Sequence, residues 1–121
     1  MNKELPKFIK EFQQRPLDAR LKDAHKIKVK YNNERIPIIV DAIETDFKIN
    51  KNKYLVPINL KMSEFIYILR RHINILEEEC IFILCNNKLV NMLSTMYELY
   101  SQEKDNDNFL YLVITKENAY G

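Results

Sequence analysis

Glycine is almost absent from this sequence of 121 residues: the only one is Gly121, the last residue. Average usage, near 7%, would give roughly eight in a chain of this length. A glycine-rich loop that cradles phosphate is therefore excluded, and turns must rely on asparagine and aspartate, which tolerate left-handed backbone. The asparagines that we expect at turns are Asn32 with Asn33, Asn50 with Asn52, Asn86 with Asn87, and Asn106 to Asn108.

Long apolar runs and catalytic side chains are also scarce. No run approaches the roughly 18 residues of a membrane helix, and residues 1–10 lack the apolar stretch of a secretory signal, so we expect a cytoplasmic chain. The two histidines, His25 and His72, have no nucleophile or carboxylate at a diagnostic spacing, which argues against an enzyme. Cys80 and Cys85 form no Cys-x-x-Cys pair and are predicted to be reduced core residues, so we expect no metal or other cofactor.

Charge is unevenly distributed along the chain. The total of 19 basic and 17 acidic residues gives +2, which is too small to make the whole chain a nucleic-acid binder, and we expect no specific nucleic-acid partner. Residues 1–35 carry ten basic and five acidic residues, whereas the rest carries nine and twelve. This basic N-terminal segment includes a lysine stripe on the polar face of a predicted helix, formed by Lys22, Lys26 and Lys30.

Hydrophobic periodicity predicts two helices, then strand, strand, helix, strand, strand, short helix and strand. The predicted ranges are 3–12, 16–31, 35–42, 53–57, 61–73, 80–85, 88–90, 95–100 and 109–114. The second strand carries a lysine and ends in proline, as edge strands do. This order favours an α+β fold, a ubiquitin-like β-grasp with two additional N-terminal helices, over a ferredoxin-like sandwich.

No internal repeat or low-complexity linker divides the chain, so we expect one domain. Within it we distinguish an N-terminal helical subregion over residues 1–31, a β-grasp core over 32–115 and a flexible tail over 116–121.

The helix predicted over 61–73 is apolar over a wider arc than one packing face requires. Its first stripe is Met62, Ile66, Leu69 and Ile73, and its second is Phe65, Ile68 and His72. Two interpretations of the second stripe stay open: either the N-terminal helices cover it, or it lines an apolar groove for a peptide that pairs with the edge strand.

A series of motifs, in a fixed order and spacing, resembles the autophagy-related ubiquitin-like modifiers of the GABARAP and light-chain-three family over nearly the whole chain after about Arg15. The motifs are Lys26-Ile27, Lys30-Tyr31, Arg35-Ile36-Pro37, Lys53-Tyr54-Leu55-Val56-Pro57, Phe65 with Arg70 and Ile73, Asn86-Asn87, Met96 with Leu99-Tyr100, Phe109-Leu110-Tyr111 and Tyr120-Gly121. The chain departs from the family at His72, where arginine is usual, after Asn87, where a proline is missing, and in the connector over 44–52.

The resemblance implies a modifier that is conjugated through its terminal glycine. Gly121 would be activated with ATP, passed as a thioester between activating and conjugating enzymes, and joined to phosphatidylethanolamine. A glycine without a Cβ suits a tail that threads a narrow active site, and two acyl chains anchor a protein stably without a membrane span. A cysteine protease would process or deconjugate the chain, which would be cytoplasmic when free and on autophagosomal or related membranes when lipidated.

The resemblance also implies two pockets for short acidic aromatic-x-x-aliphatic motifs of cargo receptors, which would pair as a strand along residues 53–55. The residues at the aromatic pocket are Asp23, Ile27, Pro37, Ile39, Lys53, Leu55 and Phe109. The residues at the aliphatic pocket are Tyr31, Val56, Pro57, Leu60, Phe65, Ile68 and His72. Basic residues, among them Lys28, Lys53 and Arg70, would steer acidic peptides to the groove.

A second hypothesis is a β-grasp interaction module without covalent chemistry. Such a module would bind a peptide in the same groove, or would bind tubulin or RNA through the lysine stripe at Lys22, Lys26 and Lys30. The two hypotheses differ in whether Gly121 becomes an acyl donor.

Overall fold

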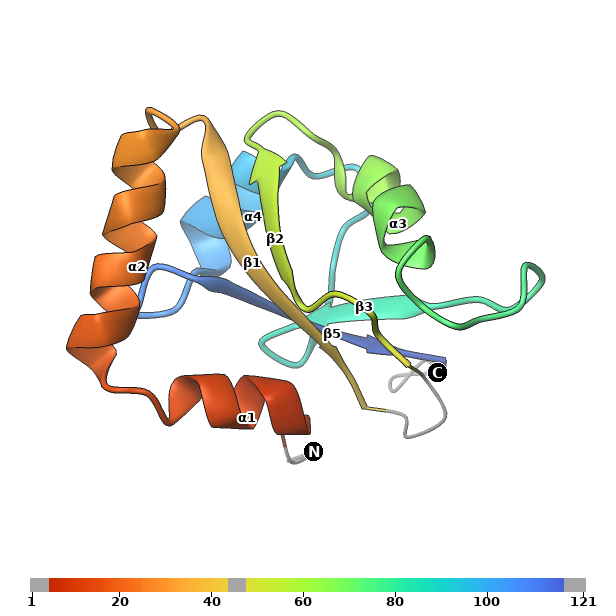
Figure 1. Cartoon of the computed structure of the whole chain (residues 1–121). Coiled ribbons are helices and arrows are strands. Elements are labelled where there is room, and N and C mark those ends of the chain that lie inside the picture. The colour runs from red at the N-terminus through yellow and green to blue at the C-terminus, as the bar shows by residue number, and fades with distance from the viewer. Residues whose placement is uncertain (1–4, 44–47, 117–121) are drawn as a thin grey trace.

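The computed structural model describes residues 5–43 and 48–116 and contains a mixed five-stranded sheet with helices on both faces (Figure 1). The elements are α1 (Lys7–Gln13), α2 (Leu17–Lys30), β1 (Arg35–Ala42), β2 (Lys53–Pro57), α3 (Met62–Arg70), β3 (Phe82–Cys85), β4 (Lys88–Leu89), α4 (Met96–Glu103) and β5 (Leu110–Thr115). The strand order is β2-β1-β5-β3-β4. The parallel β1 and β5 lie between antiparallel neighbours, which is the predicted ubiquitin-like arrangement rather than a ferredoxin-like one.

Side chains of the central strands alternate between two cores, because successive residues of a strand point to opposite faces. On β1, Ile36, Ile38 and Val40 belong to the larger core with α3 and α4. Ile39 belongs to the smaller core, which it shares with Ile9 of α1 and with residues of α2. Burial on both faces explains why residues 36–40 read as a continuous apolar run instead of an alternating one.

Asparagine takes the left-handed backbone positions that glycine usually fills. The described residues with positive φ are all asparagines, Asn32, Asn33, Asn86, Asn87 and Asn108, with φ from 51° to 67°. Positive φ at both Asn86 and Asn87 is typical of the two-residue turn that joins the paired strands β3 and β4. Asn50 and Asn52, which were also expected at turns, do not have positive φ, and the chain bends at Asn50.

Helix α3 ends three residues earlier than the periodicity predicts. The backbone after Arg70 pairs instead with the segment before β2: Ile73 forms an antiparallel bridge with Ile49. The N–H of Asn50 donates to the carbonyl oxygen of His72 at 2.8 Å, and the N–H of Asn74 donates to that of Lys48 at 3.0 Å. Tertiary pairing therefore overrides the helical pattern at its C-terminal end.

The arrangement of the sheet explains how β1 accommodates Pro37, and it corrects one prediction about the cysteines. Pro37 lies inside β1 but just before the parallel ladder with β5, which begins at Ile38, so its missing N–H costs no ladder bond there. The prediction that both cysteines are core residues is wrong for Cys80, which is exposed because it precedes β3, whereas Cys85 is buried at the end of that strand.

Candidate functional site

Strand β2 forms one edge of the sheet, as its composition predicts. In an antiparallel pair, backbone groups of alternate residues point toward and away from the partner. The N–H of Val40 donates to the carbonyl oxygen of Asn52 at 2.8 Å, so even-numbered residues of β1 and β2 bond to each other. The backbone groups of Lys53 and Leu55 therefore point to the open edge, where the guanidinium of Arg35 reaches the carbonyl oxygen of Leu55 at 3.4 Å.

The residues predicted for the aromatic pocket gather on the face covered by α1 and α2. Ile39 and Phe109 are core members of the smaller cluster, and Ile27 packs against it. Leu55 of the edge strand is 36% exposed, and Pro37 is buried. Ile39, Phe109 and Pro37 are therefore buried, whereas Leu55 of the edge strand is accessible. That these residues receive an aromatic side chain stays a prediction.

Two residues at this face, Phe12 and Arg15, were missed by the sequence analysis. The ring of Phe12 packs on that of Phe109, with 5.1 Å between centroids. The guanidinium carbon of Arg15 and the Nζ of Lys53 lie 5.2 and 5.4 Å from the centroid of the Phe12 ring. Arg15 also forms an ion pair with Asp23 at 2.8 Å. Two cations, Arg15 and Lys53, therefore lie close to the Phe12 ring. The sequence feature that could have identified Phe12 is its spacing of three residues from Ile9 on the first predicted helix.

The residues predicted for the aliphatic pocket lie mainly on the opposite face of the sheet, under α3. Val56 and Phe65 belong to the larger core, with Leu60 and Ile68 packed against it. Because α1 and α2 cover the other face (Figure 1), they do not cover the second stripe of α3. Phe65 is fully buried, so the accessible part of the stripe is formed by its half-buried neighbours, Ile68 and His72.

Tyr54 lies between these residues and is a further member that the sequence analysis did not assign to a pocket. Its ring is 5.4 Å from the ring of Phe65 and 5.8 Å from that of His72, measured between centroids. Burial raises the pKa of Tyr54 to about 12. Tyr31, which was also predicted for the aliphatic pocket, belongs to neither core cluster. The centroid of its ring lies 6.0 Å from the guanidinium carbon of Arg35.

The predicted steering charges occupy different surroundings. The Nη2 of Arg70 donates to the backbone carbonyl oxygens of Leu76, Glu77 and Glu79 at 3.0 to 3.1 Å, so this guanidinium also holds the loop after α3. Lys28 lines a cavity between α2 and α4 instead of the open edge of β2. Their effect on peptide binding stays a prediction.

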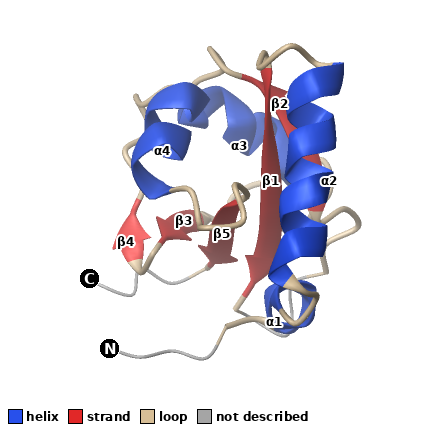
Figure 2. Cartoon of the chain, turned by 90° about the vertical axis from the view of Figure 1, so that its left-hand side faces the viewer, coloured by secondary structure: helices blue, strands red, loops and turns tan. Residues whose placement is uncertain are grey.

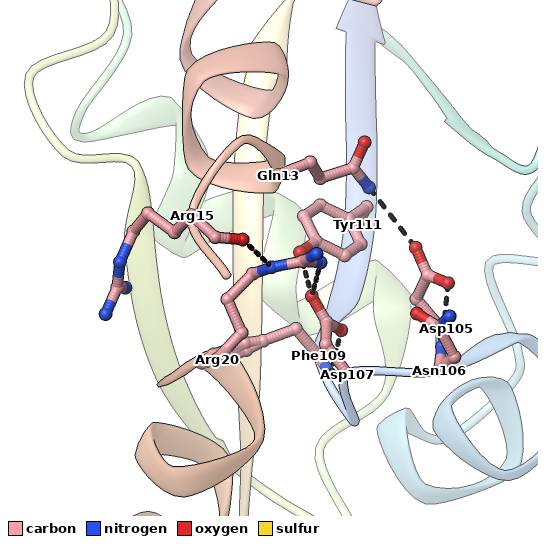
Figure 3. A network of polar contacts seen from close by, with 8 residues as sticks. All are labelled: Gln13, Arg15, Arg20, Asp105, Asn106, Asp107, Phe109 and Tyr111. Carbon is pink, nitrogen blue, oxygen red and sulfur yellow. Dashed lines mark hydrogen bonds and ion pairs between the residues drawn. The ribbon is translucent and has the colours of Figure 1, made fainter. Parts of the chain in front are cut away.

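A buried polar network fixes the smaller core against α2 (Figure 3). The guanidinium of Arg20 is 2.8 Å from the carboxylate of Asp107, which is fully buried. The hydroxyl of Tyr111 donates to the same carboxylate, and the N–H of Phe109 donates to it at 2.9 Å. Burial and then the Asp107 contact raise the pKa of Tyr111. The network thus positions Phe109 at the floor of the predicted aromatic pocket.

Some predictions fall outside what the structure describes or concern other chemistry. Gly121 and the rest of the tail after Lys116 lie outside the described residues. In residues 5–43 and 48–116, no group of three or more histidine, cysteine or carboxylate side chains is arranged to hold a metal ion. None of the helices in that part of the chain is long and apolar enough to cross a membrane.

Comparisons with known proteins agree with the fold. Residues 19–121 match the family described as "Autophagy protein Atg8 ubiquitin like". Over 108 residues the chain is 40% identical to "Autophagy-related protein 8A" of Oryza sativa subsp. indica, covering 88% of this chain and 90% of that protein. "Autophagy-related protein 8a" of Arabidopsis thaliana is 39% identical, with 88% of each chain covered. The crystal structure of Trypanosoma brucei ATG8 has a TM-score of 0.78 and 28% identity, covering 85% of this chain and 90% of its own.

Proposed function

The chain belongs to the Atg8 family of ubiquitin-like autophagy proteins, and from this premise we propose that it is a modifier and adaptor, not an enzyme. In this proposal Gly121 is joined to phosphatidylethanolamine, and the open edge of β2 binds short acidic motifs of cargo receptors. The partners would be the activating and conjugating enzymes, a deconjugating cysteine protease and the receptors. The chain would be cytoplasmic when free and on autophagosomal or related membranes when lipidated.

The observation that carries the binding part is the position of β2 between two apolar sets on opposite faces of the sheet. A peptide that adds a strand to an open edge gains main-chain hydrogen bonds there and presents its side chains alternately to the two faces. Residues three apart in such a strand point to opposite faces. An aromatic-x-x-aliphatic motif therefore offers its aromatic residue to the Ile39 and Phe109 side and its aliphatic residue to the α3 side.

The charges around the aromatic set favour an acidic motif. Lys53 and Arg15 both lie over Phe12, and the Arg15 to Asp23 pair has side chains that are 40% exposed. An acidic residue beside the aromatic anchor can pair with either cation, which raises the association rate and fixes the register of the peptide.

Two substitutions test the groove with a fluorescently labelled acidic aromatic-x-x-aliphatic peptide. Leu55→Ala shortens an exposed side chain on the aromatic side, and Ile68→Ala shortens a half-buried side chain on the aliphatic side. Each is expected to weaken the binding free energy by about 2 kcal/mol, because the truncated side chain no longer contacts the peptide. Phe65 is unsuitable, since it is core. Val29→Ala is the matched control, because Val29 is 66% exposed on α2. Unchanged affinity in both groove variants would refute the binding site.

Conjugation is tested separately with the activating and conjugating enzymes, ATP and phosphatidylethanolamine liposomes. The adenylated carboxylate of Gly121 would form a thioester, and the amine of the lipid would displace the cysteine sulfur to leave an amide. We expect a lipid adduct by mass spectrometry that is lost in Gly121→Ala and retained in Asn118→Ala. Failure of the unsubstituted chain to form an adduct would leave the interaction module without covalent chemistry.

A further inference from the structure

A cavity of about 400 Å³ lies between α2, α4 and the beginning of β1. The parallel ladder with β5 begins only at Ile38, so the first residues of β1 have no strand beside them on that side. In Figure 2, α4 and α2 lie on either side of this part of β1. The cavity shares Pro37 with the predicted aromatic pocket, but none of its residues belongs to the edge strand β2.

The lining of this cavity is rich in cations. Lys28 comes from α2, Arg35 from β1, and Lys104 follows the end of α4, and no described carboxylate lines the cavity. Within residues 5–43 and 48–116, none of these three side chains forms an ion pair. Lys28 and Lys104 therefore bring two positive charges to the lining, from α2 and from the end of α4, with no described carboxylate beside them in the lining, and each favours an anion in the cavity. Arg35 contributes to the wall, but its guanidinium reaches the carbonyl oxygen of Leu55 at the edge of β2.

The remaining walls are two tyrosines and small polar groups. Tyr97 and Tyr100 come from α4, together with the hydroxyl-bearing Ser101. The hydroxyl of Tyr100 donates to the carbonyl oxygen of Asn108 at 2.7 Å, and the Nζ of Lys104 lies 5.3 Å from the centroid of its ring. The hydroxyl contact thus holds the ring in place as a flat wall, with the ammonium group of Lys104 beside it.

We propose that this cavity binds a small polyol or sugar that carries two or more phosphate groups. Lysine ammonium groups bind phosphate as point charges, a hydroxyl donor can complete the contacts, and tyrosine faces suit the aliphatic face of a ring. The volume is that of a small-molecule site. The same chemistry occurs in a free inositol phosphate and in a phosphoinositide headgroup, and the proposal covers both sources. It is independent of the conjugation of Gly121 and of peptide binding at β2.

Isothermal titration calorimetry with inositol 1,4,5-trisphosphate tests the site on the full chain. We expect Lys28→Glu and Lys104→Glu each to weaken binding at least about tenfold, because each reverses one charge of the lining. Lys26→Glu is the matched control: it makes the same change two residues earlier, on the opposite side of α2, where we expect less than about a twofold effect. Circular dichroism and thermal unfolding of each variant establish that it is folded.

Amide chemical shifts locate the ligand, and vesicles distinguish its source. We expect the largest shifts at Lys28, Ser101 and Lys104. Sedimentation with phosphatidylcholine vesicles that contain phosphatidylinositol 4,5-bisphosphate, and not with vesicles of equal phosphatidylserine charge, would identify a lipid headgroup; binding of the soluble compound alone would identify a free ligand. No binding of either compound, equal losses in Lys28→Glu and Lys26→Glu, or shifts confined to other faces would overturn the proposal.

Discussion

The hydroxyl of Tyr54 is the only buried side-chain oxygen or nitrogen in the described ranges, 5–43 and 48–116, that has no hydrogen-bond partner. An unsatisfied buried hydroxyl costs free energy because it loses its hydration. We therefore expect Tyr54→Phe to raise the free energy of unfolding at pH 7 by roughly 1 kcal/mol in urea titrations. Tyr67→Phe, at a side chain that is 74% exposed, should change it by less than about 0.5 kcal/mol. Destabilisation in Tyr54→Phe would show that the hydroxyl makes a stabilising contact.

The pH dependence of the free energy of unfolding provides a second test of the buried Tyr54 hydroxyl. Burial raises the pKa of Tyr54 from 10.0 to about 12, so the folded protein holds this proton more tightly than the unfolded chain does. The resulting contribution is fully present below about pH 10 and is lost as the pH rises through 12. Unfolding free energies measured between pH 9 and 12 should therefore fall less steeply in Tyr54→Phe than in the unsubstituted chain.

Two ion pairs between aspartate and arginine have equal nitrogen to oxygen distances but differ in burial. Comparing them therefore separates the effect of burial on stability from the effect of pairing. The Arg20 to Asp107 and Arg15 to Asp23 pairs both measure 2.8 Å, but the side chains are 12% and 0% exposed in the first and 40% each in the second. Asp107→Asn should lower the free energy of unfolding by about 3 kcal/mol, because it leaves a largely buried guanidinium without its charge partner.

The exposed pair provides the control for that experiment. Asp23→Asn should cost less than about 1 kcal/mol, since water screens an exposed pair. Both variants can be measured by urea unfolding at one salt concentration. Equal costs would mean that burial adds nothing to the pair at Asp107.

At the scale of elements, α1 depends on a contact that no local pattern specifies. The carboxylate of Asp41 in β1 accepts hydrogen bonds from the N–H groups of Phe8 and Ile9 at 2.7 and 3.3 Å, at the positive end of the helix. Asp41→Ala should destabilise α1 by about 1 kcal/mol, the typical cost of a lost cap. Amide exchange at Ile9 to Phe12 should then be roughly fivefold faster.

Asp18→Ala is the control for the docking of α1. Within residues 5–43 and 48–116, the carboxylate of Asp18 accepts a hydrogen bond only from the adjacent N–H of Ala19, so its loss should leave exchange in α1 unchanged. If Asp41→Ala also left exchange in α1 unchanged, the packing of Ile9 and Phe12 alone would hold the helix.

Features that depend on local interactions could be predicted from the sequence, and features that depend on contacts between distant segments could not. The helical and strand periods identified all nine elements, and the scarcity of glycine identified Asn86 and Asn87 as a turn, because these signals are local. The early end of α3 was not predictable, since it depends on the pairing of Ile73 with Ile49 across the chain. The contact of Phe12 with Phe109 and the exposure of Cys80 likewise depend on tertiary packing.

At the scale of the whole molecule, one sheet separates the two predicted pockets. Ile39 and Phe109 belong to the core under α1 and α2, whereas Val56 and Phe65 belong to the core with α3 and α4. Both sets flank the same edge strand. A peptide that pairs with β2 can therefore reach both pockets only if its two anchors point to opposite faces, and the fold itself sets a rule for their spacing.

This rule predicts how peptide affinity depends on the separation of the two anchors. In a strand, an odd separation places the anchors on opposite faces and an even separation places them on the same face. Peptides with one or three residues between the anchors, otherwise identical to the acidic aromatic-x-x-aliphatic peptide, should bind about 2 kcal/mol more weakly than it does. This is the typical contribution of one anchor to the binding free energy. Ile68→Ala should weaken the first peptide and leave the two respaced peptides nearly unchanged, since their aliphatic residue no longer reaches α3. Fluorescence anisotropy of the three peptides measures both effects, and equal affinity for all three would mean that the motif does not bind as an added strand.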